Sequence, residues 1–135
     1  PIYDIPMKKY LLSSLFLLLF TTGSSQTVVA WYAKINISDL DDYNAHMEKY
    51  WLPVADKHVE NGNLIGYQYL DHGWGDEWSV VIHFEAKNRQ AFSKAWSGIF
   101  KDYTDSTPEN VRKKAWKAVT EHKDNIYSLR HSKRN

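Results

Sequence analysis

Apolar and polar side chains alternate most clearly along residues 77–85, which read EWSVVIHFE. One side of this segment carries Trp78, Val80, Ile82 and Phe84. The other side is mixed and includes His83. Such a period of two predicts a β-strand with one apolar face. Residues 27–35 and 64–70 are rich in β-branched and aromatic types and predict two more strands, and residues 125–130 predict a short closing strand.

Spacings of three and four between apolar residues predict helices between these strands. The first helix is expected to run from an N-cap at Ser38 to a stop at Gly62. Pro53 lies inside this run and predicts a kink near Leu52, or a division of the helix into two pieces, because proline lacks a backbone N–H and crowds the preceding turn.

Two further helices are predicted in the second half of the chain. Asn88 is expected to cap the first of them, and Thr107 followed by Pro108 is expected to start the second. The last helix is expected to bury apolar residues as far as Val119, and also His122. Trp116 falls outside its apolar stripe. That position predicts either a partner contact or a side chain covered by the segment before residue 107.

The order of elements is βαββαβ with an extra helical segment, which predicts an α+β, ferredoxin-like antiparallel sheet with helices on one face. The uncovered face is expected to carry Tyr32, Tyr67 or Tyr69, and His83. Such a face is too apolar to remain in water over a whole sheet. We therefore expect two sheets to pack face to face in a homodimer.

Residues 7–25 have the layout of a signal peptide: a basic start, an apolar run and a small, polar end. Residues 1–6 precede this leader, residues 26–131 form the single predicted domain, and residues 132–135 are a basic tail. The expected location is the periplasm or the medium. Contact with a membrane is expected only through the leader, whose apolar run is too short for a span.

Charge and composition narrow the possible partners. The chain has a net charge of +1 and contains no cysteine. Without Lys8, Lys9 and Asp4 the net charge becomes zero, which argues against a nucleic-acid partner. Stability cannot come from disulfides, so it must come from the core or from dimerisation.

The chain resembles the dimeric α/β-barrel superfamily, and more closely a group of exported bacterial barrel proteins. The resemblance is carried by residues 31–35 (WYAKI), 51–53 (WLP), 61–62 (NG) and 78–81 (WSVV), with Tyr43 and Glu48 between them. It covers most of residues 27–130 and implies the fold. The superfamily includes cofactor-independent monooxygenases and haem-degrading enzymes, but their catalytic Asn, Trp and His residues have no counterparts that can be placed here.

Two classes of function follow from these patterns. In the first, the protein binds a small apolar or aromatic molecule without chemistry, in a pocket between sheet and helices that Tyr43, Tyr50, Trp51 and Trp96 help to line, or it serves as an assembly module. In the second, it is an oxygenase- or isomerase-type enzyme that needs no cofactor.

The enzyme hypothesis depends on an acid–base pair. His83 would act with Tyr32 or Tyr67, provided both side chains point into one cavity. A hydrogen-bonded histidine inside a dimer sheet is the simpler interpretation. The chain lacks a His-Glu-x-x-His pattern, a Walker loop and a dinucleotide-binding glycine motif, so we predict neither a metal nor a cofactor.

Overall fold

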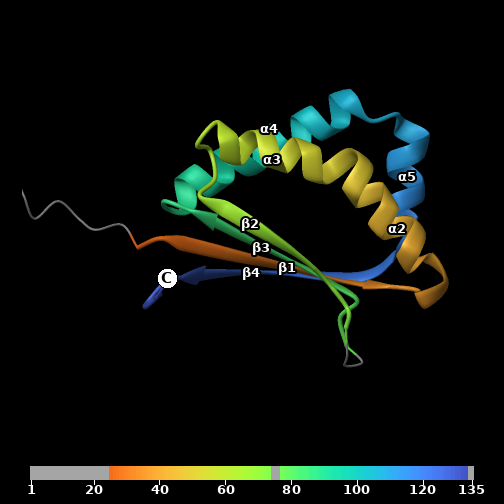
Figure 1. The fold of residues 1–135 in the computed structure, drawn as a ribbon, viewed down its shortest axis with the longest axis horizontal. Coiled ribbons are helices and arrows are strands. Elements are labelled where there is room, and N and C mark those ends of the chain that lie inside the picture. Colours follow the sequence, from red (N-terminus) through yellow and green to blue (C-terminus); the bar gives the residue numbers. More distant parts are fainter. Residues whose placement is uncertain (1–24, 74–76, 134–135) are drawn as a thin grey trace, which may run out of the picture.

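Within residues 25–73 and 77–133, which the computed structural model describes, a four-stranded antiparallel sheet carries the helices on one face (Figure 1). Its strands are β1 (Thr27–Ile35), β2 (Gly66–Asp71), β3 (Val80–Ala86) and β4 (Val119–Ser128). Their spatial order is β2-β3-β1-β4. This is the ferredoxin-like arrangement, so the predicted fold class is confirmed. The predicted leader lies outside the described residues, apart from Ser25.

The first connection consists of four consecutive helical pieces. They are η2 (Ile37–Asp39), α2 (Leu40–His46), the π-helical η3 (Met47–Trp51) and α3 (Leu52–Glu60). Pro53 lies in the first turn of α3, directly after the π-helical piece. The wider π turn accommodates a residue that has no N–H and crowds the turn before it. The predicted division near Leu52 is therefore confirmed.

The predicted helix starts are right at one position and wrong at two. Asn88 caps α4 (Arg89–Ser106), and its Oδ1 accepts a hydrogen bond from the Ala91 N–H at 2.8 Å. Ser38 is not an N-cap, because it lies inside η2. The cap of α5 (Glu109–Ala118) is Pro108, whose carbonyl accepts from Val111 and Arg112. The Thr107 hydroxyl is buried and makes no capping bond.

The last strand begins earlier than predicted. We expected the helix to continue through Val119 towards His122, with a strand only over residues 125–130, and this was wrong: α5 ends at Ala118 and β4 covers Val119–Ser128. β4 pairs with the whole of β1, with an irregularity opposite Lys34 and Ile35. Pairing with a complete neighbouring strand outweighs the weak helical pattern of these residues.

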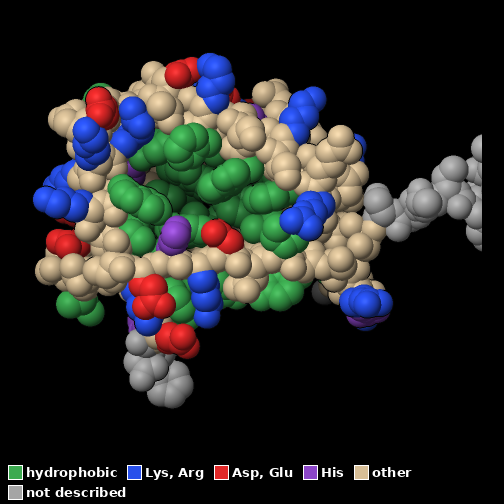
Figure 2. Space-filling model, turned by 180° about the vertical axis from the view of Figure 1, so that it is seen from behind, with side chains coloured by type: hydrophobic (Ala, Val, Ile, Leu, Met, Phe, Trp, Pro, Cys, Tyr) green, Lys and Arg blue, Asp and Glu red, His purple; other side chains and the backbone are tan. Residues whose placement is uncertain are grey.

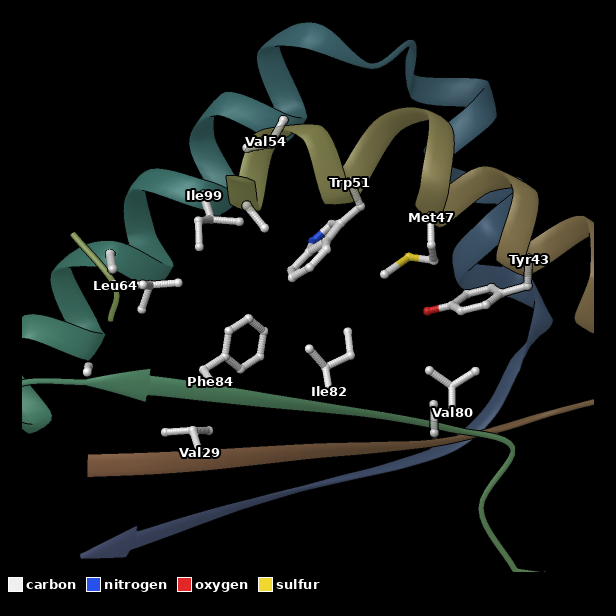
Figure 3. Close-up of a cluster of buried hydrophobic side chains, with 14 of the residues drawn as sticks. Val29, Tyr43, Met47, Trp51, Val54, Leu64, Val80, Ile82, Phe84 and Ile99 are labelled. Atoms are coloured by element: carbon white, nitrogen blue, oxygen red, sulfur yellow. The ribbon is translucent and has the colours of Figure 1, made fainter. Parts of the chain in front are cut away.

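The core lies between the sheet and the helical layer. Val80, Ile82 and Phe84 project from β3 towards Met47 and Trp51 (Figure 3). The ring of Trp51 meets Phe84 edge-on with centroids 5.7 Å apart. Because aromatic side chains bury large areas, this pair is central to the attachment of the first helical run to the sheet.

One close contact fixes α4 beside α3. His58, from α3, is buried; its Nε2 donates to Asp102 Oδ2 at 2.9 Å and its Nδ1 accepts from Asn63 Nδ2 at 3.1 Å. The imidazole lies directly over Gly98 of α4, where a Cβ would be 2.6 Å from His58 Cε1. Only glycine allows the two helices to approach this closely around the ring.

The helical layer covers the sheet unevenly. α4 makes its main contacts with α3, η3 and β3, whereas α5 lies against α2 and the start of β4. Over the described residues, α4 and β4 share no contact of comparable extent. The helix-facing side of β1 and β4 is therefore less covered than that of β3.

The Gly98 contact predicts that a glycine-to-alanine substitution lowers the free energy of unfolding here, although the same substitution usually stabilises a helix. Alanine normally favours a helix by about 1 kcal/mol over glycine. In Gly98→Ala, however, the new methyl group displaces the His58 ring, and we expect a loss of about 1–3 kcal/mol in the free energy of unfolding. Urea denaturation measures this loss. Ser97→Ala, at the exposed neighbouring position, is the matched control and should stay within about 0.5 kcal/mol of wild type. A Gly98→Ala protein as stable as wild type would contradict the contact.

Candidate functional site

The open face of the sheet brings Tyr32 and His83 together. The register of β1 on β3 pairs Ala30 with His83 and Tyr32 with Val81, so both predicted catalytic side chains lie on the face away from the helices. Both line a shallow surface hollow of about 510 Å³, together with Tyr127 and residues 128–131. One half of the predicted acid–base constellation is thus assembled in one place.

The surroundings of Tyr32 favour its protonated form. Burial, and then the neighbouring Tyr127 hydroxyl, raise the pKa of Tyr32 above its ordinary value. The Trp78 ring meets Tyr32 edge-on at 5.8 Å, and Lys123 Nζ lies over both rings, 5.2 Å from Tyr32 and 4.3 Å from Trp78. Tyr32 can therefore donate a hydrogen bond or a proton at neutral pH, but it is a poor base.

Tyr67 does not join this group. It pairs with Phe84 in the register of β2 on β3 and so faces the helices, as does Tyr69. The Tyr67 hydroxyl donates to Asp56 Oδ1 at 2.6 Å, and the pKa of Tyr67 is raised by burial and by this carboxylate. The sheet separates Tyr67 from His83, so a pair made of these two residues does not exist here. The register of β2 on β3, in which Tyr67 pairs with Phe84, decides this outcome.

The four residues predicted to bind a ligand are mainly packing residues. Tyr43 and Trp51 belong to the core, with exposed fractions of 6% and 8%. Tyr50 lies against His46, with centroids 5.1 Å apart. Trp96 stacks on Phe92 at 6.1 Å and meets Phe84 edge-on. Of the four, Trp96 is the one beside a surface that a ligand can reach, as the geometry of α4 shows below.

A second candidate surface lies on the helix-facing side of the sheet. It is an apolar area between the helices and the edge of the sheet at β4, and it is hollowed at its centre (Figure 2). His122 links its two walls. The imidazole meets Trp31 of β1 edge-on at 6.3 Å and Trp116 of α5 edge-on at 5.3 Å. The register of β4 on β1 places Ile126 opposite the core residue Val29, so Ile126 faces the same side.

The helix α4 supplies the upper wall of this area. Gly98 and Asp102 face His58 and α3, so helical periodicity turns Trp96 and Phe100 to the opposite flank. Phe100, Trp116 and Ile126 are 60%, 61% and 49% exposed, which is unusual for large apolar side chains gathered on one face. We call this surface the aromatic hollow; it consists of Trp31, Trp96, Phe100, Trp116, His122 and Ile126.

Sequence patterns pointed to only part of the aromatic hollow. Trp116 stood out because it lies off the apolar stripe of its helix. His122 and Ile126 share one strand face, with Asp124 between them, but this grouping is visible only once the strand is known to start at Val119. Nothing in residues 27–35 indicates that the part of the sheet face beside Trp31 is open.

Polar groups gather where α2, α4 and α5 meet. His46 Nε2 and the Tyr103 hydroxyl form a hydrogen bond of 2.7 Å. Burial lowers the pKa of His46, so its imidazole stays neutral at pH 7. Burial raises the pKa of Tyr103, and the nearby positive charge of Arg112 partly offsets that rise. Each side chain of the His46–Tyr103 pair satisfies the other, which is the ordinary arrangement for half-buried polar groups.

Residues 25–73 and 77–133 contain neither a metal-binding cluster nor a membrane-spanning helix. No group of three or more His, Asp or Glu side chains there could hold a metal ion. No helix in the same residues has the length and apolar character of a membrane span.

Comparisons with known proteins find similarity in structure alone. No protein-family model matches the chain, and no curated protein sequence matches it. A dimeric ferredoxin-like protein from an uncultured marine organism superposes with a TM-score of 0.64 at 12% identity, over 83% of this chain and 93% of that protein.

Two further solved structures have a similar fold. An uncharacterized NIPSNAP-like domain protein from Burkholderia xenovorans gives a TM-score of 0.61 at 16% identity, over 82% of this chain and 90% of its own. A putative antibiotic biosynthesis monooxygenase from Nitrosomonas europaea gives 0.58 at 11% identity, over 83% and 97%. The chain therefore has the same ferredoxin-like fold as these solved structures.

Proposed function

We propose that this chain is an exported homodimeric protein that binds a small apolar or aromatic molecule in the aromatic hollow. The observation that carries the proposal is the exposure of Phe100, Trp116 and Ile126 around one recess of the surface. Binding sites for small molecules are concave and mostly apolar, with a few polar groups that orient the ligand. His122 is such a group, because its ring is held between Trp31 and Trp116.

The size of the apolar surface sets the expected affinity. A ligand that covers about 200 Å² of it, and buries a similar area of its own, gains roughly 10 kcal/mol from burial. The loss of ligand motion and the ordering of side chains offset part of this gain. We therefore expect dissociation constants on the order of 10 µM to 1 mM for a bicyclic aromatic probe.

The open face supports the homodimer part of the proposal. Leu70 and Tyr127 are 45% and 49% exposed, and the registers of their strands place them on the same face as Tyr32 and His83. A second copy packed against this face would cover its apolar side chains. Two of the solved structures with this fold are described as dimeric ferredoxin-like proteins, which favours the same assembly here.

A catalytic role for Tyr32 and His83 is the second candidate. It rests on one observation, namely that both side chains line the hollow of the open face. A dimer that packs through this face would also enclose that hollow, as acid–base chemistry requires. The raised pKa of Tyr32 keeps its hydroxyl protonated at pH 7, so Tyr32 would act as the hydrogen-bond donor and His83 as the proton acceptor.

Export predicts a defined N-terminus. When the whole chain is expressed in a bacterium with a general secretion pathway, cleavage after Ser25 should give a periplasmic or secreted product that starts at Gln26. Intact-mass measurement of the purified protein checks this. Replacing Leu17 and Leu18 by lysine should keep the chain full-length inside the cell, because a charged apolar run does not function as a leader. A processed cytoplasmic product from the wild-type chain would contradict export.

Ligand binding is tested with 2-naphthylacetamide, a neutral bicyclic probe, by calorimetric titration of the purified protein. We expect Trp116→Ala to weaken binding about tenfold, since the substitution removes one aromatic wall of the recess. Ile37→Ala is the matched control: Ile37 is 92% exposed outside the hollow, and its variant should bind like wild type. His83→Ala should also leave the affinity unchanged.

Two results would count against the aromatic hollow. Absence of heat up to millimolar probe would remove the binding proposal. Loss of binding in His83→Ala with normal binding in Trp116→Ala would move the site to the open face and favour the enzyme alternative.

The homodimer is tested by sedimentation equilibrium. Wild type should sediment as a dimer, whereas Leu70→Glu should shift the population to monomer, because the substitution places a charge on the apolar face. Ile37→Glu places the same charge at an exposed position outside that face and should leave the dimer intact. A wild-type protein that stays monomeric at 100 µM would overturn the assembly.

A further inference from the structure

One cation beside the aromatic hollow has no acidic partner. Arg112, in α5, is partly buried, and its Nε donates to the Thr107 carbonyl at 3.0 Å. It forms no ion pair with any carboxylate of the described residues, whereas Lys113 and Lys114 beside it pair with Glu109 and Asp42. Partly buried guanidinium groups usually bind an acid, since they offer a planar fork of donors.

The geometry of α5 directs Arg112 towards the hollow. Lys114 reaches Asp42 on α2 and so marks one flank of the helix. Residues four apart share a helix face, so Arg112 lies one turn before Trp116, on the flank opposite Lys114. Trp116 contacts His122 and forms a wall of the hollow. Arg112 therefore lies at the end of the hollow where α4 meets α5.

Other donors lie at the same end. The Thr107 hydroxyl is buried, with an exposed fraction of 3%, and it has no hydrogen-bond partner in the described residues. The hydroxyl oxygen of Thr104, a partly buried residue one turn earlier in the chain, is also buried and has no partner in the described residues. Arg112 is bound to the carbonyl of Thr107 itself, so donors of two kinds lie close together.

The charges around the hollow are unevenly distributed. Lys and Arg side chains border the apolar area on its helical side, with some Asp and Glu side chains among them (Figure 2). Arg89 belongs to the same flank of α4 as Trp96 and Phe100 by helical periodicity, and it forms no ion pair within the described residues. Asp124 is the opposing charge: its register partner is Trp31, so it faces the hollow from the sheet side.

We propose that the ligand of the aromatic hollow is an amphipathic monoanion, with an apolar or aromatic body and a carboxylate. Its carboxylate binds the free N–H groups of Arg112, and its body packs against Trp116, Phe100 and Trp31. This inference rests on the proposed ligand-binding function and names the class of molecule. A single carboxylate matches one guanidinium fork in charge and in shape, and Asp124 at the far side repels the anion and so fixes its orientation.

Three probes share one aromatic body and differ in charge: 2-naphthylacetate, 2-naphthylacetamide and 2-(2-naphthyl)ethylamine. Each is titrated calorimetrically into the purified processed protein at pH 7 and low salt. We expect the acetate to bind at least tenfold more tightly than the amide, and the amine to bind most weakly. Arg112→Gln should remove the preference by weakening the acetate about tenfold while changing the amide less than twofold.

Two further variants make the readout specific. Arg112→Lys keeps the charge but loses the fork, and it should retain part of the preference. Asp124→Asn is the matched control, because it removes a negative charge where Arg112→Gln removes a positive one. It should leave acetate binding unchanged or strengthen it by up to threefold. The amide also reports whether Arg112→Gln keeps the hollow intact, since its binding depends on the walls alone.

The outcomes distinguish failure of ligand binding in the aromatic hollow from failure of the inference that the ligand is an anion. Equal affinities for acetate and amide, both lost in Trp116→Ala, would overturn the anion inference and keep the hollow as a binding site. Binding of none of the probes would overturn both. Arg112→Gln weakening acetate and amide alike would assign Arg112 to the packing of the α4–α5 junction and overturn its role in recognition. Tightest binding of the amine, weakened by Asp124→Asn, would reverse the sign of the ligand charge and overturn the inference.

Discussion

The architecture depends on the contact of the His58 imidazole with Gly98, which sets where α4 lies. Both ring nitrogens are hydrogen-bonded, to Asp102 and Asn63, so the imidazole is fixed in orientation. A glycine beneath it lets α4 come close to α3. Because α4 is held towards α3 and β3, it leaves the β1–β4 half of the helix-facing side uncovered. The recess above that half is a consequence of close packing elsewhere in the helical layer.

The uncovered half explains why aromatic residues are exposed on one side of the molecule. The tryptophan on β1, Trp31, occupies a core-face position but lies under the gap between α4 and α5. Trp116 and His122 close part of that gap through edge-on ring contacts. Such contacts cover less area than a packed helix does, so Phe100 and Ile126 stay about half exposed. The aromatic hollow therefore has a physical origin in the spacing of two helices over a four-stranded sheet.

Sequence patterns predicted the elements more reliably than they predicted what the elements expose. The alternation predicted over residues 77–85 is a local signal and was confirmed from Val80, where β3 begins, but Trp78 was wrongly placed on the apolar side, since it lies against Tyr32 of the open face. The cap at Asn88 is a second local signal and was confirmed. The face occupied by Tyr67 depends on the register of a hairpin, which no local pattern fixes. The start of β4 at Val119 depends on pairing with β1, a partner more than eighty residues away. His122 was consequently assigned to a helix, and the wall of the hollow that it forms was missed.

The strand β4 contributes to both candidate surfaces, and the parity of each position decides which surface it belongs to. Ile126 and His122 face the aromatic hollow, whereas Tyr127 and Lys123 face the open side with Tyr32. Neighbouring residues of β4 therefore act on different surfaces, although only 3.3 Å of strand separates them on average. β4 is also the edge strand of the sheet, so a shift of its register by one residue would exchange the two sets. The pairing of β4 with all nine residues of β1 prevents that exchange and so holds both surfaces in place.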